Sequence, residues 1–597
     1  MLLYFQLIQR PLFYIYNRRE SDRSLRLIDV WHIIVKGGRS DVISVSYLTA
    51  LPLILFTVAT FTGGVWLRPV LTAYNVIAGI VLGVTTVVDC GLYPYWKFKL
   101  DASVLPYIRA FKSAVSSVST GFVILAFVAL AVVISLCFLW LQAVTGMALG
   151  GVPFKAAGVG QHVGVSMAFL IEAACLFAMI RGLGRRPNNP SVSFFSHVPF
   201  FNHVALNPLY SFIYSLSVND KIDGAFHKFD DDDCSREFNE LYPAYVAPKD
   251  RLIKTTRPNV LFIIWESLSS RFVESLGGQP GVTPNIDRLA REGVMFTHLD
   301  CNSFRTDRGL VALLSGYLAQ PTTSVIRMSK KLPHLPALPR RFKELGYETT
   351  AVHGGDLTIF HKAEYYLTVG HDRLMSQDDL PKELPTGKWG VHDHAVMEWL
   401  FDDIMDKTRR GVQWFTTLQT LSSHEPWMVP YGRLASDPVA NTFAYVDDAL
   451  GKLVDRLRET EAWDNLLIVV TGDHGCNTGQ YLPPQEYARV PLLLTGGAVA
   501  GPRRIDTIMS QTDIAATLLG QMGLNHDEFI FSRDVMAESY TYPFSFHTFV
   551  NGFMFRDETG YTVVDNVSDK AVIEPDETRE HRGRVILQYL YSDLAKR

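Results

Sequence analysis

Four long apolar runs constrain this chain more than any other feature of its sequence. They span residues 42–66, 69–90, 119–147 and 161–181, and each approaches or exceeds the roughly 20 apolar residues that cross a lipid bilayer. The chain has 597 residues, too many for one compact domain, and its excess of apolar residues lies in the first third. We therefore expect a transmembrane domain of four to five helices over residues 1–184, followed by a more polar domain.

The segments that flank these runs carry mixed signals. Residues 1–17 are apolar but contain Arg10 and a following proline, which leaves a fifth membrane helix and an interfacial segment equally open. Residues 18–40 are basic and amphipathic, and the loop 91–118 mixes aromatic with basic side chains, as interfacial helices do. Glu172 lies inside the last apolar run, where a carboxylate is either a functional group or a hydrogen-bonding partner for a neighbouring helix.

Residues 185–256 have the composition of a linker, which begins with Arg-Arg-Pro-Asn-Asn-Pro. Their acidic run 230–233 predicts a solvated turn rather than a calcium site, because its carboxylates lack the spacing of a cation-binding loop. The six cysteines of the chain show neither zinc-ligand spacing nor a dense disulfide framework. The net charge of −4 gives no reason to expect a nucleic-acid partner.

Residues 257–535 alternate strand-like apolar runs with helical patterns. The expected strands are 259–265, 348–353, 412–420, 465–471 and 490–495, and the expected helices are 284–292, 307–315, 336–346, 393–406 and 441–459. Such alternation is typical of a mostly parallel sheet with helices on both faces. Residues 536–597 alternate in short stretches and end in a helical pattern, so we expect a small added sheet in a C-terminal subdomain.

Polar residues at the ends of two expected strands predict a metal site. Glu266 follows the first of the expected strands, and Asp473 and His474 follow the fourth. In open α/β sheets, ligands bind just beyond the carboxyl ends of the strands. Thr306 lies at the start of an expected helix, where backbone N–H groups favour a phosphate. Taken singly, Thr306 predicts a helix cap and the Asp-His pair a turn, but together the four residues predict a divalent-metal site for phosphoryl transfer.

Five motifs carry a resemblance to a known family: Trp265-Glu266-Ser267, Thr283-Pro284-Asn285-Ile286-Asp287, Arg305-Thr306-Asp307-Arg308-Gly309, Gly472-Asp473-His474-Gly475 and Ser510-Gln511-Thr512-Asp513-Ile514. The region from residue 257 to about residue 520 resembles the sulfatase-like branch of the alkaline phosphatase superfamily. It is most similar to the lipoteichoic acid synthase family of membrane-anchored phosphoglycerol transferases. The resemblance implies an α/β sulfatase-like domain after the membrane helices. It also implies that Thr306 is the nucleophile and that one Mn2+ ion, or alternatively Mg2+ or Zn2+, is bound by Glu266, Thr306, Asp473 and His474.

The same resemblance assigns residues to the substrate. His353 and His424 correspond to histidines of the family's substrate pocket, and the family's Trp-Asn-Arg motif reads Phe360-His361-Lys362 here. The lysine keeps a cation at this place but not the bidentate fork of an arginine, so headgroup specificity stays open. His424 also follows an expected strand and is the candidate general acid or base. Arg305 and Arg308 flank the nucleophile and are expected to bind the substrate phosphate.

We thus expect an enzyme that moves a phosphoglycerol group from a phosphatidylglycerol-type lipid to an envelope glycan or lipid through a phospho-threonine ester. The alternative is a phosphoethanolamine transferase acting on lipid A or an envelope glycan, although such enzymes are usually rich in disulfides and this chain has few cysteines in its polar part. A sulfuric-ester hydrolase is disfavoured because a sulfatase needs Cys or Ser where this chain has Thr306. A phosphodiester hydrolase is likewise a less favoured alternative, and a non-catalytic membrane scaffold is disfavoured because all four metal-ligand positions are intact.

The distribution of basic residues conflicts with the membrane topology that the resemblance implies. Basic side chains gather in residues 18–40, in residues 91–118 and after the last apolar run, whereas the two intervening loops carry only Arg68 and Lys155. The positive-inside rule would place the polar domain in the cytoplasm. The family uses its donor lipids on the outer face of the membrane. We therefore expect a multi-pass protein of the bacterial inner membrane, with the catalytic domain on the outer, periplasmic side and the basic loops near anionic headgroups.

Overall fold

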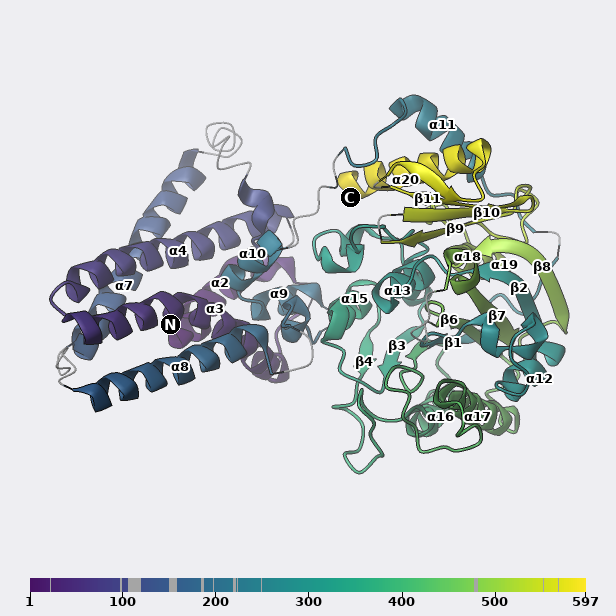
Figure 1. Ribbon diagram of the computed structural model, residues 1–597, viewed down its shortest axis with the longest axis horizontal. Helices are drawn as coiled ribbons and strands as arrows, with labels where there is room; N and C mark the ends of the chain where they lie inside the picture. The colour runs from purple at the N-terminus through teal and green to yellow at the C-terminus, as the bar shows by residue number, and fades with distance from the viewer. Residues whose placement is uncertain are drawn as a thin grey trace. The chain divides into compact units, whose positions relative to one another are not determined.

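The computed structural model describes the whole chain except residues 22, 97–98, 106–119, 150–157, 184–186, 197, 218–221, 223, 249, 477–481, 551 and 567. The chain divides into two compact units, Met1–Asn219 and Asp220–Arg597, each with its own hydrophobic core (Figure 1). The first unit contains the expected membrane helices, and the second contains the expected α/β domain.

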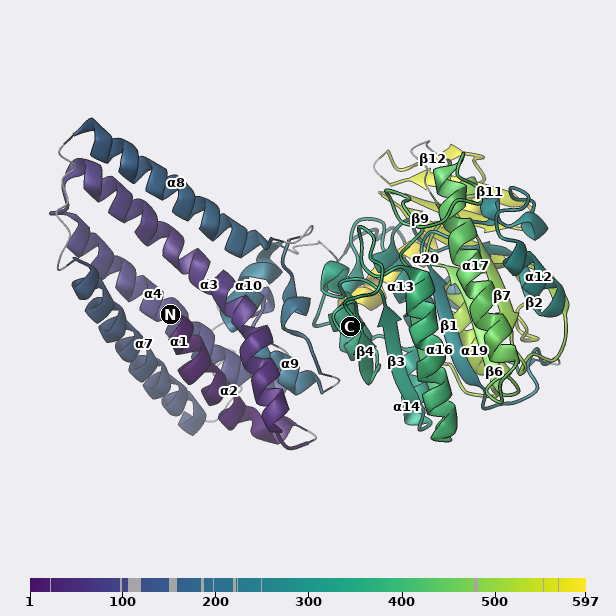
Figure 2. The ribbon, with the colours of Figure 1, turned by 90° about the horizontal axis from the view of Figure 1, so that it is seen from below.

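Four helices of the first unit are long and apolar enough to cross a membrane. They are α3 (Leu27–Thr62), α4 (Leu67–Trp96), α7 (Thr120–Leu149) and α8 (Val159–Arg181). Helix α4 packs along α7, and α3 packs along α8 (Figures 1 and 2). Helix α3 starts well before the expected run because no proline interrupts residues 27–41, so the basic stretch 18–40 belongs largely to this helix. Glu172 lies on α8 with its side chain exposed, and most of the expected interfacial loop 91–118 lies outside the described residues.

The N-terminal segment is helical but is not among the candidate spans found in the described residues. It consists of α1 (Leu2–Tyr4), η1 (Phe5–Gln9) and α2 (Arg10–Asn17). Arg10, which interrupts its apolar pattern, is buried and donates to both carboxylate oxygens of Asp41 in α3, at 2.8 and 2.9 Å. Arg10 also donates to the backbone carbonyls of Val204 and Ala205, at 3.0 and 2.8 Å. This compensated ion pair therefore joins three segments of the first unit.

Residues 185–256, expected to be a linker, contain helices that pack into the two cores. These elements are η4 (Pro190–Ser193), α9 (Pro199–Ala205), α10 (Pro208–Ser217) and α11 (Asp231–Leu241). Phe201 enters the core of the first unit, and Phe238 enters the core of the second, so these apolar side chains give parts of the segment a fixed structure. The acidic run, expected to be a turn, begins α11 instead, and Asp230 accepts from the Asp232 N–H at 2.9 Å. Carboxylates are favoured at this end of a helix because its free N–H groups carry partial positive charge.

The second unit is built on an eight-stranded sheet with the order β4-β3-β5-β1-β6-β7-β2-β8. Its strands are β1 (Asn259–Trp265), β2 (Val294–Asp300), β3 (Glu348–His353), β4 (Arg373–Met375), β5 (Trp414–Gln419), β6 (Leu466–Gly472), β7 (Arg489–Thr495) and β8 (Arg503–Ser510). Strand β7 runs antiparallel to both neighbours and the other described pairs are parallel, which confirms the expected mostly parallel sheet. The sequence prediction lacked β2, β4 and β8. Strand β8 lies at the sheet edge and exposes Arg503 and Arg504, so it has no continuous apolar run.

The central strands β1 and β6 lie side by side in register, with Trp265 opposite Gly472. Alternate residues of β1 enter two separate cores, so both of its faces are buried and its apolar run is uninterrupted. The helices that contribute to these cores include α12 (Pro284–Glu292), α13 (Thr306–Ser315), α16 (Asp393–Arg409), α17 (Pro438–Arg458) and α19 (Asp513–Gln521). Because the two strands are parallel, Glu266 and Asp473, which follow them, emerge at the same edge of the sheet.

A small antiparallel sheet, with the order β12-β11-β10-β9, confirms the expected C-terminal addition. It consists of β9 (Phe544–Phe549), β10 (Gly552–Asp557), β11 (Gly560–Asp565) and β12 (Lys570–Ile573), and α20 (Glu577–Lys596) packs against it.

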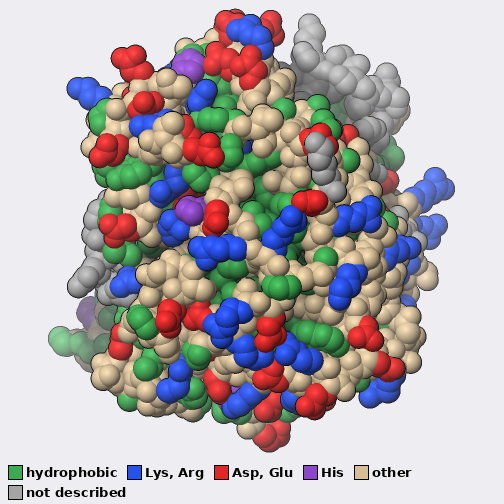
Figure 3. All heavy atoms as spheres, turned by 90° about the vertical axis from the view of Figure 1, so that its right-hand side faces the viewer, with side chains coloured by type: hydrophobic (Ala, Val, Ile, Leu, Met, Phe, Trp, Pro, Cys, Tyr) green, Lys and Arg blue, Asp and Glu red, His purple; other side chains and the backbone are tan. Residues whose placement is uncertain are grey.

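On the face drawn in Figure 3, basic and acidic side chains are interspersed. This mixture of charges contrasts with the exposed apolar side chains of α7 and α8 in the first unit.

Candidate metal centre

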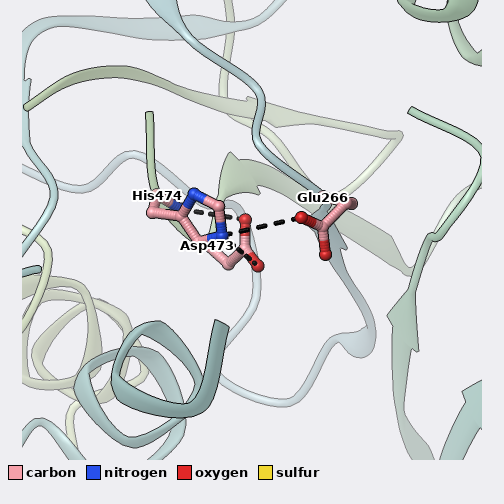
Figure 4. A group of neighbouring side chains, drawn as sticks. All are labelled: Glu266, Asp473 and His474. Atoms are coloured by element: carbon pink, nitrogen blue, oxygen red, sulfur yellow. Dashed lines mark hydrogen bonds and ion pairs between the residues drawn. The ribbon is translucent and has the colours of Figure 1, made fainter. Parts of the chain in front are cut away.

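Glu266, Asp473 and His474 form a carboxylate–histidine cluster at the carboxyl ends of β1 and β6. Their side chains point toward one another (Figure 4), and one potential ligand atom from each lies within 4.8 Å of the others. His474 Nε2 lies 3.5 Å from Glu266 Oε1 and 3.5 Å from Asp473 Oδ2. Among the described residues, no other group of three such side chains meets this distance.

Thr306 joins this cluster from the first turn of α13. Its Oγ1 lies 3.3 Å from Glu266 Oε2 and 3.3 Å from His474 Nε2. The hydroxyl also sits at the start of the helix, where unpaired backbone N–H groups favour an anion. The structure thus brings all four expected metal ligands together, although they come from three distant parts of the chain.

The donor atoms of the cluster fit a divalent cation. Asp473 Oδ2 is buried and accepts no hydrogen bond of normal geometry in the described part of the chain. His474 Nδ1 lies 2.8 Å from the Gly475 carbonyl, so Nδ1 carries the hydrogen and Nε2 presents its lone pair to the carboxylates. Oxygen ligands with a single imidazole suit Mn2+, Mg2+ or Zn2+.

The charges of the cluster shift its pKa values in opposite directions. Burial raises the pKa of Asp473 to about 6, and the negative charge of Glu266 adds to this shift. Burial also raises the pKa of Glu266, but the positive charge of His474 and of more distant cations outweighs it, so the pKa lies below its usual value. Burial lowers the pKa of His474, but the two carboxylates raise it above its usual value. A proton on His474 therefore balances part of the negative charge, a role that a bound cation would take over.

Three further side chains position the ligands. Ser267 donates its backbone N–H to Asp473 Oδ1 at 2.7 Å and its hydroxyl to Glu266 Oε1 at 2.9 Å. Gln511 donates its amide to the carbonyl of Gly472, the last residue of β6, at 2.8 Å and to the carbonyl of Asp473 at 2.9 Å. The Tyr487 hydroxyl lies 3.2 Å from His474 Nδ1. The sequence reasoning assigned no role to these residues, although Ser267 and Gln511 lie within the motifs that carried the resemblance.

Gly309 explains the close approach of α13 to the cluster. A Cβ atom at this position would lie 2.2 Å from the Asp473 carbonyl oxygen, which no side chain tolerates. Glycine in the Thr-Asp-Arg-Gly motif therefore lets the helix that carries Thr306 rest against the end of β6.

The expected substrate residues lie partly in a buried cationic group. His353, at the end of β3, pairs its Nδ1 with the Gln419 carbonyl at 2.9 Å, and its Nε2 lies 3.1 Å from Lys362 Nζ. Burial lowers the pKa of Lys362 to about 8, against the raising effect of Glu266 and Asp473, so this cation lies within electrostatic range of the cluster.

His361 Nδ1 lies 2.9 Å from Glu364 Oε2 in the helix that follows it. Its φ of 61° and the φ of 57° at Phe360 are left-handed, a strained conformation that is concentrated at functional sites. The two residues stand directly before α15 (Lys362–Thr368). The strained turn therefore fixes the start of this helix and the position of Lys362, its first residue.

His424 is half-buried in the loop after β5. Its Nδ1 lies 3.0 Å from the Glu425 carbonyl, and its ring lies 4.4 Å from the Trp389 ring. The carbonyl fixes the hydrogen on Nδ1, which leaves Nε2 as the proton-accepting nitrogen. Its charge lowers the pKa of Glu266, so His424 lies within electrostatic range of the cluster.

The two arginines beside Thr306 occupy different surroundings. Arg305 is exposed and stacks on Phe304 at 5.6 Å. Arg308 is buried and donates to the carbonyls of Gln320 and Thr323, at 2.8 to 3.1 Å. Arg308 is expected to bind the substrate, and in the structure two of its nitrogens, Nε and Nη2, also hold the segment after α13. Its position two residues into the helix from Thr306 turns it toward this segment, because a helix turns by about 200° over two residues.

Residues 258–524 match the Sulfatase family. The second unit thus contains a sulfatase-like domain. Phosphoglycerol transferase I of Xanthomonas campestris is 27% identical over 330 residues, which cover 50% of this chain and 45% of that protein. Lipoteichoic acid synthase 2 of Bacillus subtilis is 22% identical over 385 residues, which cover 57% of this chain and 58% of that protein. The chain thus spans about half the length of the curated relatives that it matches, and the family resemblance carried by its motifs is confirmed.

Two crystal structures share the fold of this sulfatase domain. A protein of the alkaline phosphatase superfamily from Vibrio parahaemolyticus has a TM-score of 0.55 and 23% identity, over 62% of this chain and 97% of that chain. The lipoteichoic acid synthase LtaP from Listeria monocytogenes has a TM-score of 0.51 and 16% identity, over 60% of this chain and 98% of that chain. At these identities the likeness concerns the fold alone.

Proposed function

We propose that this chain is a metal-dependent transferase that moves a phosphoglycerol group from a phosphatidylglycerol-type lipid to an envelope glycan or lipid acceptor. The observation that carries the proposal is the position of the Thr306 hydroxyl, 3.3 Å from both Glu266 and His474 at the first turn of α13. The relatives named as phosphoglycerol transferases and lipoteichoic acid synthases support the reaction class. The four apolar helices support a membrane anchor, which would hold the site near lipid headgroups and raise their effective concentration.

Thr306 would act as the nucleophile. Its Oγ1 attacks the phosphorus of the lipid headgroup, a Thr306–phosphate ester forms, and the bond between phosphorus and the diacylglycerol oxygen breaks. A divalent cation held by Glu266, Thr306, Asp473 and His474 would supply the positive charge that acidifies the hydroxyl and stabilises negative charge on the phosphate. Mn2+ is the ion that we propose. The hydroxyl proton of Thr306 passes to solvent and returns when the ester is resolved.

His424 would move the other protons. Its protonated Nε2 gives a proton to the leaving diacylglycerol oxygen, and the neutral ring then takes the proton of the acceptor hydroxyl. That hydroxyl attacks the same phosphorus and releases Thr306. Lys362 and Arg305 would balance the phosphate charge, and the Nδ1 bond of His353 to a backbone carbonyl would hold its Nε2 toward Lys362. We place the catalytic unit on the outer side of a bacterial inner membrane, where the donor lipid and the acceptor meet.

The test compares wild-type, Thr306→Ser and Thr306→Ala protein with fluorescent phosphatidylglycerol in detergent. Thr306→Ser keeps a hydroxyl and should retain part of the diacylglycerol release, whereas Thr306→Ala should lose it. Mass spectrometry of the wild-type protein should find a phosphoglycerol adduct on Thr306. Equal release by wild type and Thr306→Ala would rule out the covalent route. Release from phosphatidylethanolamine alone would make the chain a phosphoethanolamine transferase.

A further inference from the structure

One cavity of the second unit lies apart from the carboxylate–histidine cluster. It has a volume of about 180 Å3 and lies between α11, the loop after α19 and residues 539–542. Helix α19 separates it from the cluster, because Gln511 contacts the end of β6 just before the helix, whereas the cavity lies beside Gly520 near its far end. Seven residues of helix between Asp513 and Gly520 span about 10 Å.

Three residues that line this cavity each carry a buried polar atom with no hydrogen-bond partner in the described part of the chain. These atoms are Asp534 Oδ2, His526 Nε2 and the Tyr242 hydroxyl. Asp534 is 3% exposed and His526 is 4% exposed, and all three residues line the cavity. Unpaired buried polar atoms are costly, so three of them around one cavity indicate a ligand that pairs with them.

Tyr245 and Gly520 hold this group together. The Tyr245 ring meets the His526 ring edge-on, with their centroids 4.3 Å apart. A Cβ atom at Gly520 would lie 2.1 Å from Asp534 Oδ2 and 3.3 Å from the Tyr245 hydroxyl. Glycine at this position therefore leaves room for the carboxylate next to the aromatic rings.

The charges around the cavity favour a cation. Glu240, Asp527 and Asp534 line it with a single guanidinium, that of Arg533. Arg533 is already neutralised by Asp513, with bonds of 3.1 and 2.7 Å to its two carboxylate oxygens. Burial raises the pKa of Asp534 to about 7, so its unpaired charge is unfavourable without a positive partner. Burial lowers the pKa of His526, so its ring is neutral and Nε2 can accept a hydrogen bond when Nδ1 carries the hydrogen.

We propose that this cavity binds a primary ammonium group. Such a group has three N–H donors, which match the three unpaired acceptors at Asp534, His526 and Tyr242. Tyr245 and Tyr540 also line the cavity and add aromatic rings to its wall. The ammonium belongs either to the ethanolamine headgroup of a lipid or to a free small amine. This proposal does not rest on the phosphoglycerol reaction, because none of its residues takes part in that reaction.

The first experiment is calorimetry of the full chain in detergent with ethanolamine, choline and glycerophosphoethanolamine. Ethanolamine should bind, and choline, whose nitrogen has no N–H donor, should bind at least about tenfold more weakly. Tighter binding of glycerophosphoethanolamine than of ethanolamine would assign the site to a lipid headgroup, and the reverse order would assign it to a free amine. Absence of binding by both amines, or equal binding of choline, would overturn the proposal and leave a cavity filled by water.

Two variants and a control test the same site. Asp534→Asn keeps the size of the side chain and should weaken ethanolamine binding by about tenfold or more, because a charged hydrogen-bond acceptor is lost. Tyr242→Phe removes a hydroxyl that has no partner, so it should weaken binding about severalfold without lowering the temperature of unfolding. Glu528→Gln removes a nearby exposed charge outside the cavity and should bind as wild type.

Diacylglycerol release should be the same in all of these proteins, because the cavity is separate from Thr306. Wild-type affinity in both Asp534→Asn and Tyr242→Phe would contradict the proposal even if ethanolamine binds. Loss of binding in Glu528→Gln to the same extent as in Asp534→Asn would mean that the general negative charge of this surface, and not the cavity, attracts the amine.

Discussion

The first unit buries its charges as complete pairs, whereas the second unit buries two carboxylates around a single imidazole. In the first unit, Arg10 faces Asp41 and Lys99 faces Asp89, and the described side chains of both pairs are almost fully buried. In the cluster of the second unit, Glu266 and Asp473 have only His474 between them. In a compensated pair the two charges neutralise each other, and the pair joins the chain segments that carry them. An uncompensated cluster is stable only with a further cation.

The difference between the paired and the unpaired buried charges depends on their charge balance and not on the unit in which the residues lie. Asp513 and Arg533 form a buried pair in the second unit, and its hydrogen bonds are as complete as those of the Arg10 pair. The pair fixes the start of α19, and we assign no chemistry to it. Buried charges in this chain therefore indicate a ligand site only where carboxylates outnumber the cations that face them.

The largest expected effect comes from removing one carboxylate of the cluster. Asp473→Asn should lower diacylglycerol release by about 10³-fold or more, because a charged metal ligand and its electrostatic field are lost. The same change should raise the unfolding temperature of the metal-free protein, because Glu266 loses a neighbour of like charge.

The fluorescent-lipid assay measures the loss of release, and differential scanning fluorimetry with and without Mn2+ measures the change in unfolding temperature. Wild-type protein should be stabilised by Mn2+, and Asp473→Asn should not be. Equal stabilisation of the variant and wild type by Mn2+ would contradict the role of Asp473 as a metal ligand.

A compensated pair should respond in the opposite way. Asp41→Asn leaves the Arg10 guanidinium buried without its counter-charge and should destabilise the first unit by about 3–5 kcal/mol. Thermal unfolding of the full chain in detergent checks this value. The double variant Arg10→Gln with Asp41→Asn should recover part of the loss. A change in Asp41→Asn of less than about 1 kcal/mol, the size typical of exposed pairs, would show that Arg10 does not depend on Asp41.

The position of α13 gives the third prediction. Gly309→Ala forces a Cβ against the Asp473 carbonyl and should shift Thr306 from the cluster, with a loss of about 10²-fold in diacylglycerol release. Gly432→Ala is the matched control, because a Cβ there meets no atom within 4 Å. Near wild-type release in Gly309→Ala would mean that the site tolerates movement of the helix.

The smallest effect is expected at an exposed pair. Glu348 accepts two hydrogen bonds from Arg410, at 2.6 and 2.9 Å, but their side chains are 42% and 44% exposed. Glu348→Gln should change the free energy of unfolding by about 0–1 kcal/mol, because solvent screens this pair. High salt should remove the difference between variant and wild type. A loss as large as that of Asp41→Asn would break the distinction between buried and exposed pairs.

Much of the fold could be predicted because the central strands and their helices repeat simple patterns. Two expected strands, 259–265 and 348–353, coincide with β1 and β3, and the expected helix 284–292 coincides with α12. These elements bury whole faces, so their residues show a clear apolar pattern. Strand β8 escaped prediction because its apolar side chains are spaced among charged residues, and the short helices of residues 185–256 escaped it because proline and polar residues interrupt their apolar runs.

The residues of the candidate site could be predicted where function determines the residue type. They were harder to predict where packing determines the direction in which the side chain points. Carboxylates that follow parallel strands must meet at one edge, so the placement of Glu266 and Asp473 followed from the order of the elements. The direction of Arg308 depends on how far α13 turns, which the sequence does not show. Likewise, Arg10 interrupts an apolar run in the sequence. Only the structure shows that it is buried and paired with the distant Asp41.

The length of α3 matches the thickness of a membrane. From Asp41 to Thr62 the helix rises about 32 Å, close to the roughly 30 Å of bilayer hydrocarbon. The Arg10–Asp41 pair would then lie at the boundary of the hydrocarbon, with Lys36 and Arg39 at the depth of the lipid phosphates. A thicker bilayer would draw this ion pair into the acyl chains, and a thinner one would tilt the helix. A first unit that crosses a membrane through α3 would therefore fit best in bilayers of about this hydrophobic thickness.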